Sequence, residues 1–408
     1  MQPSNSFILF VLVVLLILNP TLIHFFAEVQ GALAHRLSQP PPSVHRSLFL
    51  RESRATAERA PSAVGVSPSE LYAARAVPRD VVAVPRDAAA APAAPAAPAE
   101  LAALQSTTAA TCAVCGALPV LVPASGSWAL RGNGSALRTF IDLSLRDTIA
   151  GYMNFPTHAA FAVIARAQHD AGVVGAVGEI GVHHGRSFIL AALLSTPAEP
   201  LWALDLFSTL QHLNLDGSGK GDENALAINM ARVGLDVSRA TTVAMSSLDL
   251  AADYFCAAGM PRFRWFSVDG GHTEEATRRD MHAAACHLAE GGVIAVDDIF
   301  NNLFLGVTEG VFNFMALNRG RLAPFLMITG KIYFTTPSFH ARYYAAARDF
   351  FLPRYEAYTD ASKTVIAGWA VVSHSVPVHA DIESRPDKAA RVSQEFSEIL
   401  GFPVEYDA

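Results

Sequence analysis

Residues 173–187 read VVGAVGEIGVHHGRS, an apolar run that ends in a glycine-rich turn. The apolar run predicts a buried strand, and Gly181 and Gly185 allow the chain to turn tightly and a ligand to approach the backbone. Glu179 precedes the turn, where its carboxylate would repel a pyrophosphate and attract a positively charged ligand. His183 occupies the second glycine position of a GxGxxG turn, so the spacing disfavours a nicotinamide-dependent oxidoreductase.

The rest of the C-terminal half repeats this alternation of short apolar runs and amphipathic stretches. The predicted strands are 173–180, 201–204, 241–245, 263–268 and 292–296, and the predicted helices are 144–153, 158–171, 187–194, 223–233, 248–257, 274–289 and 306–317. Residues 325–329 and 332–335, with Gly330-Lys331 between them, predict a hairpin, and residues 364–372 predict a further strand. Alternating strands and helices indicate a parallel sheet covered on both faces. We therefore predict an α/β fold: a Rossmann-like, doubly wound, mainly parallel seven-stranded sheet with an antiparallel last strand.

Ligands bind such sheets at the carboxyl ends of the strands, so the residues that follow each predicted strand are the candidate site residues. Asp205 follows the second strand, where an acidic residue can accept hydrogen bonds from both hydroxyls of a ribose. An exposed aspartate that caps a turn is the alternative. Asp205 is therefore a candidate cofactor ligand.

Three further carboxylates, Asp269, Asp297 and Asp298, follow the fourth and fifth predicted strands. If these strands are neighbours, the three charges converge and need a cation between them, and oxygen ligands suit Mg²⁺. His272 lies three residues beyond Asp269, within reach of the same centre, where a neutral imidazole could take a proton from a metal-bound hydroxyl. The alternatives are helix capping for the Asp297-Asp298 pair and a loop histidine without a role.

Four segments, EIGVHHGRSF, LDLF, SVDGGHT and GGVIAVDDIFN, occur in this order at the predicted strand ends. Together they resemble the class I S-adenosylmethionine (SAM)-dependent methyltransferases, over residues 140–335. Within that class they are similar to the family 24 type, a metal-dependent group that includes sugar O-methyltransferases of macrolide and aminocoumarin biosynthesis.

The resemblance implies a role for each of these positions. Glu179, Gly181 and Gly185 would hold the methionine part of SAM, Asp205 the ribose, and Ser246 and Ser247 would contact the adenine, while Asp269, Asp297 and Asp298 would hold Mg²⁺. Catechol O-methyltransferases place a lysine base three residues after the first metal ligand. This sequence has His272 at that position instead, so the base departs from the catechol pattern.

Residues 211–222, QHLNLDGSGKGD, form a polar, glycine-rich segment after Asp205. We predict a mobile lid over the cofactor or the acceptor. The segment is not a phosphate-binding loop, because Gly221 follows Lys220 where such a loop ends in GK[ST].

The N-terminus predicts entry into the secretory pathway. Residues 7–18 are an unbroken apolar run, which suits a signal-peptide core, and the stretch to Phe26 approaches the length of a membrane anchor. We predict a signal peptide or signal anchor over residues 1–34 and a disordered Ala/Pro-rich stem over residues 35–111, which would hold an enzyme away from the membrane.

The remaining boundaries follow from these assignments. We expect a connecting segment over residues 112–136, the methyltransferase domain over residues 137–336, and a C-terminal extension packed on it over residues 337–408.

Cys112 and Cys115 are interpreted as a local disulfide or two ordinary thiols, and Cys256 and Cys286 as single thiols in helices. Asn133-Gly134-Ser135 is a glycosylation sequon, usable only in the secretory pathway.

The formal net charge of −7 and the lack of a Lys/Arg run argue against a nucleic-acid partner. We predict Mg²⁺-assisted O-methylation of a hydroxyl on a sugar or another small polar acceptor, such as a glycan. The enzyme would be anchored in the ER or Golgi membrane or secreted. A homo-oligomer that forms through the C-terminal extension is an alternative to a monomer. The competing functions are a metal-dependent hydroxylase-type relative and a non-catalytic SAM- or glycan-binding domain. Iron chemistry is disfavoured, because iron prefers two histidines and one carboxylate.

Overall fold

The computed structural model describes residues 118, 121, 133–214, 216–355, 362–374 and 385–405. The predicted signal segment, the stem and the Cys112–Cys115 pair lie outside the described residues. Within the described part, no helix combines the length and the apolar character that crossing a membrane requires.

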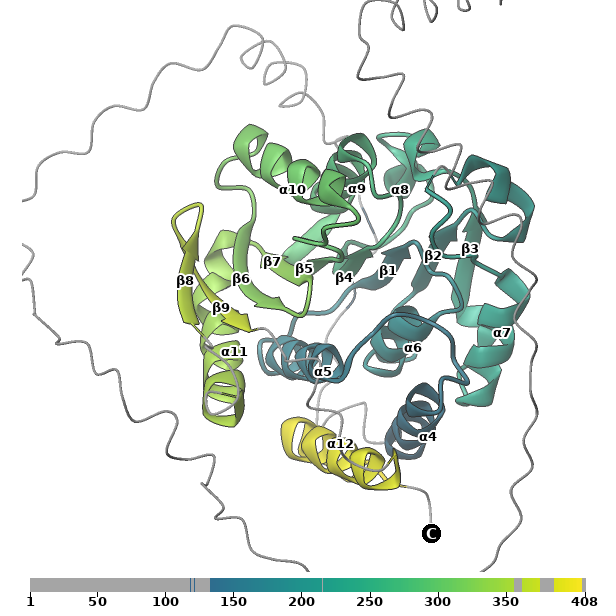
Figure 1. Cartoon of the computed structure of the whole chain (residues 1–408), viewed down its shortest axis with the longest axis vertical. Coiled ribbons are helices and arrows are strands. Elements are labelled where there is room, and N and C mark those ends of the chain that lie inside the picture. Colours follow the sequence, from purple (N-terminus) through teal and green to yellow (C-terminus); the bar gives the residue numbers. More distant parts are fainter. Residues whose placement is uncertain are drawn as a thin grey trace, which may run out of the picture. The chain divides into compact units, whose positions relative to one another are not determined.

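The described strands form one sheet in the order β3-β2-β1-β4-β5-β7-β6-β9-β8 (Figure 1). The strands are β1 (Ala176–Ile180), β2 (Leu201–Asp205), β3 (Ala240–Ala244), β4 (Phe263–Val268), β5 (Leu288–Val296), β6 (Ala323–Ile328), β7 (Lys331–Thr335), β8 (Ser362–Ile366) and β9 (Trp369–His374). β1 to β5 pair in parallel, and β7 is antiparallel to both of its neighbours, β5 and β6. The predicted doubly wound sheet with an antiparallel strand is confirmed. Two strands of the C-terminal extension continue it beyond the predicted seven, because β9 pairs with β6.

Helices cover both faces of the sheet (Figure 1). One face carries α4 (Gly134–Leu145), α5 (Phe155–Asp170), α6 (Arg186–Leu193), α7 (Glu223–Arg232), α11 (His340–Tyr355) and α12 (Arg385–Leu400), and the other carries α8 (Tyr254–Ala257), α9 (Glu274–Cys286) and α10 (Leu305–Leu317). The short 3-10 turns are η3 (Ser208–Leu213), η4 (Val237–Arg239), η5 (Ser247–Asp249) and η6 (Pro337–Phe339).

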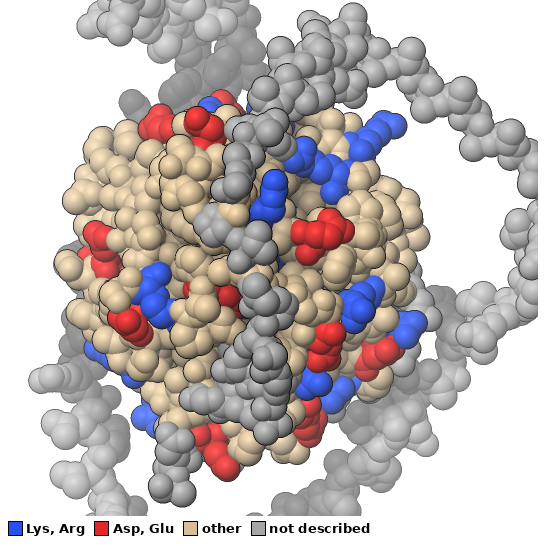
Figure 2. Space-filling view, turned by 180° about the vertical axis from the view of Figure 1, so that it is seen from behind, with Lys and Arg blue, Asp and Glu red and all other residues tan. Residues whose placement is uncertain are grey.

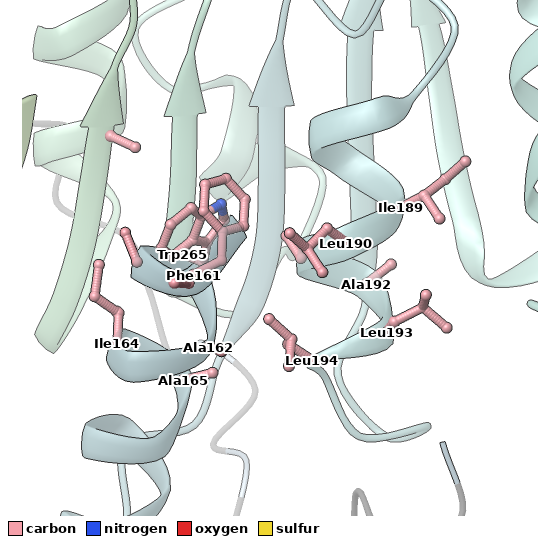
Figure 3. Close-up of a cluster of buried hydrophobic side chains, with 14 of the residues drawn as sticks. Phe161, Ala162, Ile164, Ala165, Ile189, Leu190, Ala192, Leu193, Leu194 and Trp265 are labelled. Atoms are coloured by element: carbon pink, nitrogen blue, oxygen red, sulfur yellow. The ribbon is translucent and has the colours of Figure 1, made fainter. Parts of the chain in front are cut away.

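Successive strand residues alternate between two apolar cores, as the pleat of a strand requires. In β4, Trp265 faces the α5 and α6 side, whereas Phe266 faces the α8 and α9 side. Figure 3 shows Trp265 against Phe161 of α5, and their ring centroids lie 4.3 Å apart. Burying a large apolar side chain in this way stabilises the fold by about 1.5–3 kcal/mol.

A buried ion pair lies at the amino-terminal ends of β2 and β4. Nε of Arg264, the second residue of β4, is 2.6 Å from Oε1 of Glu199, and the two side chains are only 6% and 4% exposed. Glu199 also accepts hydrogen bonds from the backbone of Gly175 and Thr196, and Arg264 donates to Leu194 O and to the side chain of Gln168. The charges are therefore desolvated but fully hydrogen-bonded.

Three predicted elements are wrong in detail. α4 ends at Leu145, so there is no helix over 144–153; instead Arg186 donates to Ile149 O and Gly151 O and fixes this stretch as a turn. The helix over 248–257 is two short pieces, η5 and α8. The strand over 364–372 is the β8–β9 hairpin, which turns at Ala367-Gly368.

Two local features bear on secretion. Cys256 and Cys286 are both disulfide-bonded, which corrects the expectation of two single thiols. In the sequon, Asn133 Nδ2, to which a glycan would be attached, donates a hydrogen bond to Leu193 O at 2.7 Å.

On the face seen in Figure 2, Lys and Arg side chains lie interspersed with Asp and Glu side chains.

Candidate active site

The carboxyl ends of β2, β1, β4 and β5 lie side by side, because these strands are consecutive in the sheet. Ile180 is in register with Val268, and Val268 with Val296, so the residues that follow each strand meet at one edge. Each predicted site residue therefore comes to the same edge of the sheet, as the sequence predicted for ligand-binding positions.

Gly181 and Gly185 are required by the backbone itself. Both have a positive φ, 85° and 91°, which favours glycine. A Cβ on Gly181 would lie 1.7 Å from the carbonyl oxygen of Asp269, so β1 and the loop after β4 touch at this point. A side chain at position 181 would separate the two loops of the site.

Glu179 is a buried carboxylate that lacks hydrogen bonds. Its side chain is 1% exposed, and no described residue donates a hydrogen bond to either oxygen. Burial raises the pKa of Glu179 to about 7, although Lys331 and the nearby hydroxyls of Ser187 and Ser267 oppose the rise. Because an unpaired buried polar group is costly, this position suits a cationic ligand group.

Asp205 is already engaged by the backbone around it. Its Oδ2 accepts from His183 N and its Oδ1 from Phe207 N, both at 2.8 Å. A Cβ on Gly221 would lie 2.1 Å from Oδ1, so the segment after β2 folds back over this carboxylate. Each carboxylate oxygen has two acceptor sites, so two ribose hydroxyls can still be bound.

Ser246 and Ser247 lie directly after β3. The hydroxyl of Ser246 accepts from Leu248 N at 3.3 Å, which starts η5. The hydroxyl of Ser247 donates to Asp280 Oδ2 at 3.1 Å. Both serines thus have structural partners at the predicted adenine position.

Lys331 is a site residue that the sequence reasoning missed. Its ammonium group is 4% exposed and lies 3.0 Å from Asp297 Oδ2 and 3.6 Å from Asp269 Oδ2. Burial lowers its pKa, but Asp297 and Asp269 outweigh this and raise it far above the usual value. The signal was present: Lys331 begins a buried strand whose neighbour, β5, ends in two aspartates.

The carboxylate of Asp297, one of the three predicted metal ligands, forms an ion pair with Lys331. The ligand atoms that approach one another within 4.8 Å belong to Asp269, His272 and Asp298. A shallow pocket at the ends of β4 and β5 is lined by these three residues together with Gly270, Gly271 and Asp297.

His272 is held between two carboxylates. Its Nε2 lies 3.1 Å from Asp298 Oδ2, its Nδ1 lies 2.7 Å from Asp216 Oδ2, and its ring stacks on Phe304 with centroids 3.8 Å apart. Burial lowers the pKa of His272, but the hydrogen bonds to Asp298 and Asp216 outweigh this and raise it. Asp216 is a second residue that the sequence reasoning did not assign.

The backbone after β5 adopts a rarely populated conformation. Asp298 and Phe300 have φ values of 58° and 59°, in the left-handed region that side chains other than glycine and asparagine seldom adopt. Asn301 Nδ2 donates to Asp298 Oδ1 at 2.7 Å and holds the turn. Such backbone strain concentrates at functional sites, and here it directs Asp298 towards His272.

Residues 179–299 match the family model described as a methyltransferase domain. The chain is similar to the O-methyltransferase NovP, with 15% identity and a TM-score of 0.38 over 44% of this chain and 79% of that one. It is similar to a TDP-rhamnose 3'-O-methyltransferase of calicheamicin biosynthesis, at 16% identity and a TM-score of 0.34 over 48% and 93%. For the O-methyltransferase TomG from Streptomyces achromogenes, the values are 18% and 0.33 over 53% and 92%. No curated protein matches the sequence significantly.

The sheet order, the glycine turn after β1 and the acidic residues at the strand ends agree with the arrangement expected from the resemblance to class I SAM-dependent methyltransferases. The match identifies residues 179–299 as a methyltransferase domain.

Proposed function

We propose that the protein transfers a methyl group from SAM to a hydroxyl of a sugar or another small polar acceptor, with the help of a divalent cation. The observation that carries this proposal is the approach of Asp269, His272 and Asp298 to one another at the strand ends. Lys331 Nζ lies 3.0 Å from Asp297 and 3.6 Å from Asp269. Burial and the neighbouring carboxylate of Asp297 raise the pKa of Asp269, so a cation held by Asp269 and Asp298 would displace a proton from Asp269. Carboxylate oxygens are the ligands that Mg²⁺ prefers.

The residues around the predicted SAM position suit its parts. The unpaired, buried carboxylate of Glu179 fits the amino group of the methionine moiety, which would supply the missing hydrogen bonds. Asp205 would hold the ribose, and Gly181 and Gly185 keep the turn free of side chains. Ser246 and Ser247 remain the candidates for the adenine.

In the reaction, SAM would supply the methyl group and Mg²⁺ would lower the pKa of the acceptor hydroxyl. Asp269 and Asp298 are the residues that would hold this cation beside the acceptor. The acceptor oxygen would form the new bond to the methyl carbon while the carbon–sulfur bond breaks and its electrons pass to sulfur, and His272 would take the hydroxyl proton. Nδ1 of His272 faces Asp216 and Nε2 faces Asp298, so Nε2 would accept the proton only after Asp298 has turned from the ring to the cation.

The choice of a polar acceptor is supported by the side chains over the pocket. The segment after β2 brings Asp216 and Ser218 to His272, and Ser218 Oγ lies 3.1 Å from Nδ1 of His272. Hydroxyl-rich molecules can replace water at such groups without leaving them unpaired.

A calorimetric titration with S-adenosylhomocysteine, with and without Mg²⁺, tests the cofactor assignment, and an acceptor screen that begins with sugars tests the reaction. Asp298→Asn should abolish Mg²⁺-dependent turnover and leave S-adenosylhomocysteine binding unchanged. Asp205→Ala should instead weaken that binding. Equal turnover of Asp298→Asn and the unmodified protein, with and without Mg²⁺, would contradict the metal assignment.

We further propose that the enzyme works in the secretory pathway. The apolar segment at residues 7–18 supports this, and so do the disulfide bonds of Cys256 and Cys286, since disulfides persist mainly in oxidising compartments. A C-terminal fluorescent fusion should co-localise with ER or Golgi markers or appear in the medium. A diffuse cytosolic signal would contradict the proposal.

A further inference from the structure

Asp280 of α9 is a buried carboxyl group that the proposed reaction does not use. Its side chain is 1% exposed, and the next residues along this side of the helix, Met281 and Ala284, belong to the apolar core. Oδ2 accepts a hydrogen bond from the Ser247 hydroxyl at 3.1 Å, whereas within the described part of the chain Oδ1 receives none. An apolar residue would be buried here at lower cost, so the contact with Ser247 calls for a functional reason.

The carboxyl group of Asp280 lies close to two loops of the proposed cofactor site. Ser247 begins the 3-10 turn η5 after β3, and Gly270 lies in the loop after β4. A Cβ on Gly270 would lie 3.1 Å from Asp280 Oδ2, the same oxygen that accepts from Ser247. Ser247 is half-buried, whereas Asp280 is buried. Of this pair, the hydroxyl is therefore the group that a ligand can reach.

The partner of a serine hydroxyl decides what the hydroxyl can offer a ligand, because the group has one hydrogen to donate and two lone pairs that accept. Burial raises the pKa of Asp280 to about 7, so at pH 8 this side chain is mainly a carboxylate, which only accepts. Ser247 therefore donates its hydrogen to Asp280. The lone pairs of the Ser247 oxygen remain, and they can accept a hydrogen bond from a ligand.

We propose that Asp280 is a positioning residue that sets the specificity for adenine, by holding the Ser247 hydroxyl as a hydrogen-bond acceptor. The proposal rests on the proposed function, in which Ser247 contacts the adenine of SAM. The amino group at position 6 of adenine is a donor and matches this acceptor. Hypoxanthine has an oxygen at position 6, which would face the Ser247 oxygen with no hydrogen between them. Such a site rejects the mismatched base, because polar groups would be buried without partners.

Two substitutions at position 280 separate this role from a merely structural one. Alanine suits the helix and removes the group that accepts from Ser247, so the hydroxyl can turn and donate to a ligand. Asparagine keeps a side-chain oxygen that can accept from Ser247, so Asp280→Asn should retain most of the selectivity that Asp280→Ala loses. Asp249→Asn is the matched control, because Asp249 is an exposed aspartate in the same turn as Ser247.

Calorimetric titration of the full-length protein at pH 8 with S-adenosylhomocysteine and with its deaminated analogue, S-inosylhomocysteine, measures this selectivity. The selectivity is the dissociation constant of the analogue divided by that of S-adenosylhomocysteine. We expect Asp280→Ala to lower this ratio about 3- to 10-fold, with tighter binding of S-inosylhomocysteine once Ser247 can donate to its oxygen. Ser247→Ala should weaken S-adenosylhomocysteine binding by a similar factor and lower the ratio, and Asp249→Asn should leave the ratio unchanged.

A gain in affinity for S-inosylhomocysteine distinguishes the proposed role from damage to the fold, which would weaken both ligands alike. Equal weakening of the two ligands by Asp280→Ala would overturn the proposal, and so would a ratio that stays unchanged in Asp280→Ala or in Ser247→Ala. Failure of the unmodified protein to bind S-adenosylhomocysteine would be a different result. It would refute the cofactor assignment of the proposed function, and the role of Asp280 with it.

Discussion

At the scale of single residues, Gly181 is the position least able to accept a side chain. Its φ of 85° disfavours alanine, and the carbonyl oxygen of Asp269, which lies 1.7 Å from the point that a Cβ would occupy, leaves no room for one. We expect Gly181→Ala to lower the free energy of unfolding by about 3 kcal/mol or more, which urea titration would measure. Gly234→Ala is the control: its φ is also positive, 78°, but no atom lies within 4 Å, so its cost should be only about 1–2 kcal/mol. Equal costs for the two variants would show that the contact with Asp269 is unimportant.

Asp297 and Lys331 should behave as a buried pair. Their charged atoms are 3.0 Å apart, and Lys331 is 4% exposed. We expect Asp297→Asn to destabilise the protein by about 3 kcal/mol, because a buried ammonium loses its nearest counter-charge. Combining it with Lys331→Met should restore part of the loss, as judged by a double-mutant cycle of urea unfolding. Additive losses in the double variant would argue against a direct interaction.

At the scale of elements, α9 carries a carboxyl group that should make stability depend on pH. Asp280 is 1% exposed and accepts a hydrogen bond from Ser247, and burial raises its pKa to about 7. Between pH 4 and 7 the folded protein therefore keeps a proton that the unfolded chain has lost. The contribution of Asp280 to stability is present at low pH and falls by at most about 1.4 kcal/mol per pH unit as the pH rises.

Asp280→Asn should remove this dependence and stabilise the protein at pH 8. Urea unfolding at pH 5 and pH 8 measures the effect, and Asp253→Asn, at an exposed position, serves as the control. If the free energy of unfolding of Asp280→Asn changes with pH as steeply as that of the unmodified protein, the pH dependence arises from other groups.

The elements and the site differ in how far the sequence predicted them. Buried strands with their turns were predictable, since β1, β2 and β4 coincide closely with apolar runs that end in an acid or a glycine turn. The helix over 144–153 was not, because its end depends on Arg186, a residue far along the chain that bonds to Ile149 O and Gly151 O. Local propensity contains no information about such contacts.

The site residues likewise differ in how far the sequence predicted their positions and contacts. The positions of Glu179, Asp205 and Asp269 follow from where strands end, which the apolar pattern reveals. Which carboxylate meets which partner depends on side-chain direction and on the pairing of β7 with β5, which brings Lys331 to Asp297. Asp216 reaches His272 only through the path of the segment between β2 and α7, and no spacing rule predicts that path.

At the scale of the whole molecule, the pair of Arg264 and Glu199 ties the amino ends of β4 and β2 to α5. Glu199→Gln should lower the free energy of unfolding by about 3 kcal/mol, because Arg264 would remain buried without its counter-charge. The surface pair of Arg279 and Glu275, at 3.5 Å and largely exposed, is the matched comparison. Glu275→Gln should change stability by less than about 1 kcal/mol. Similar losses of unfolding free energy in Glu199→Gln and Glu275→Gln would contradict the expectation that burial makes the first pair the more important for stability.

The pairing of β6 with β9 has a consequence for synthesis of the chain. β6, with the sequence APFLMI, is complete at Ile328, but the strand that covers its free edge ends at His374, 46 residues later (374 − 328). At translation rates of about 5–20 residues per second, the apolar edge of β6 stays without its partner for about 2–9 s on every nascent chain. Unpaired strand edges of this kind are where aggregation begins, so this interval is when the growing polypeptide most needs a chaperone.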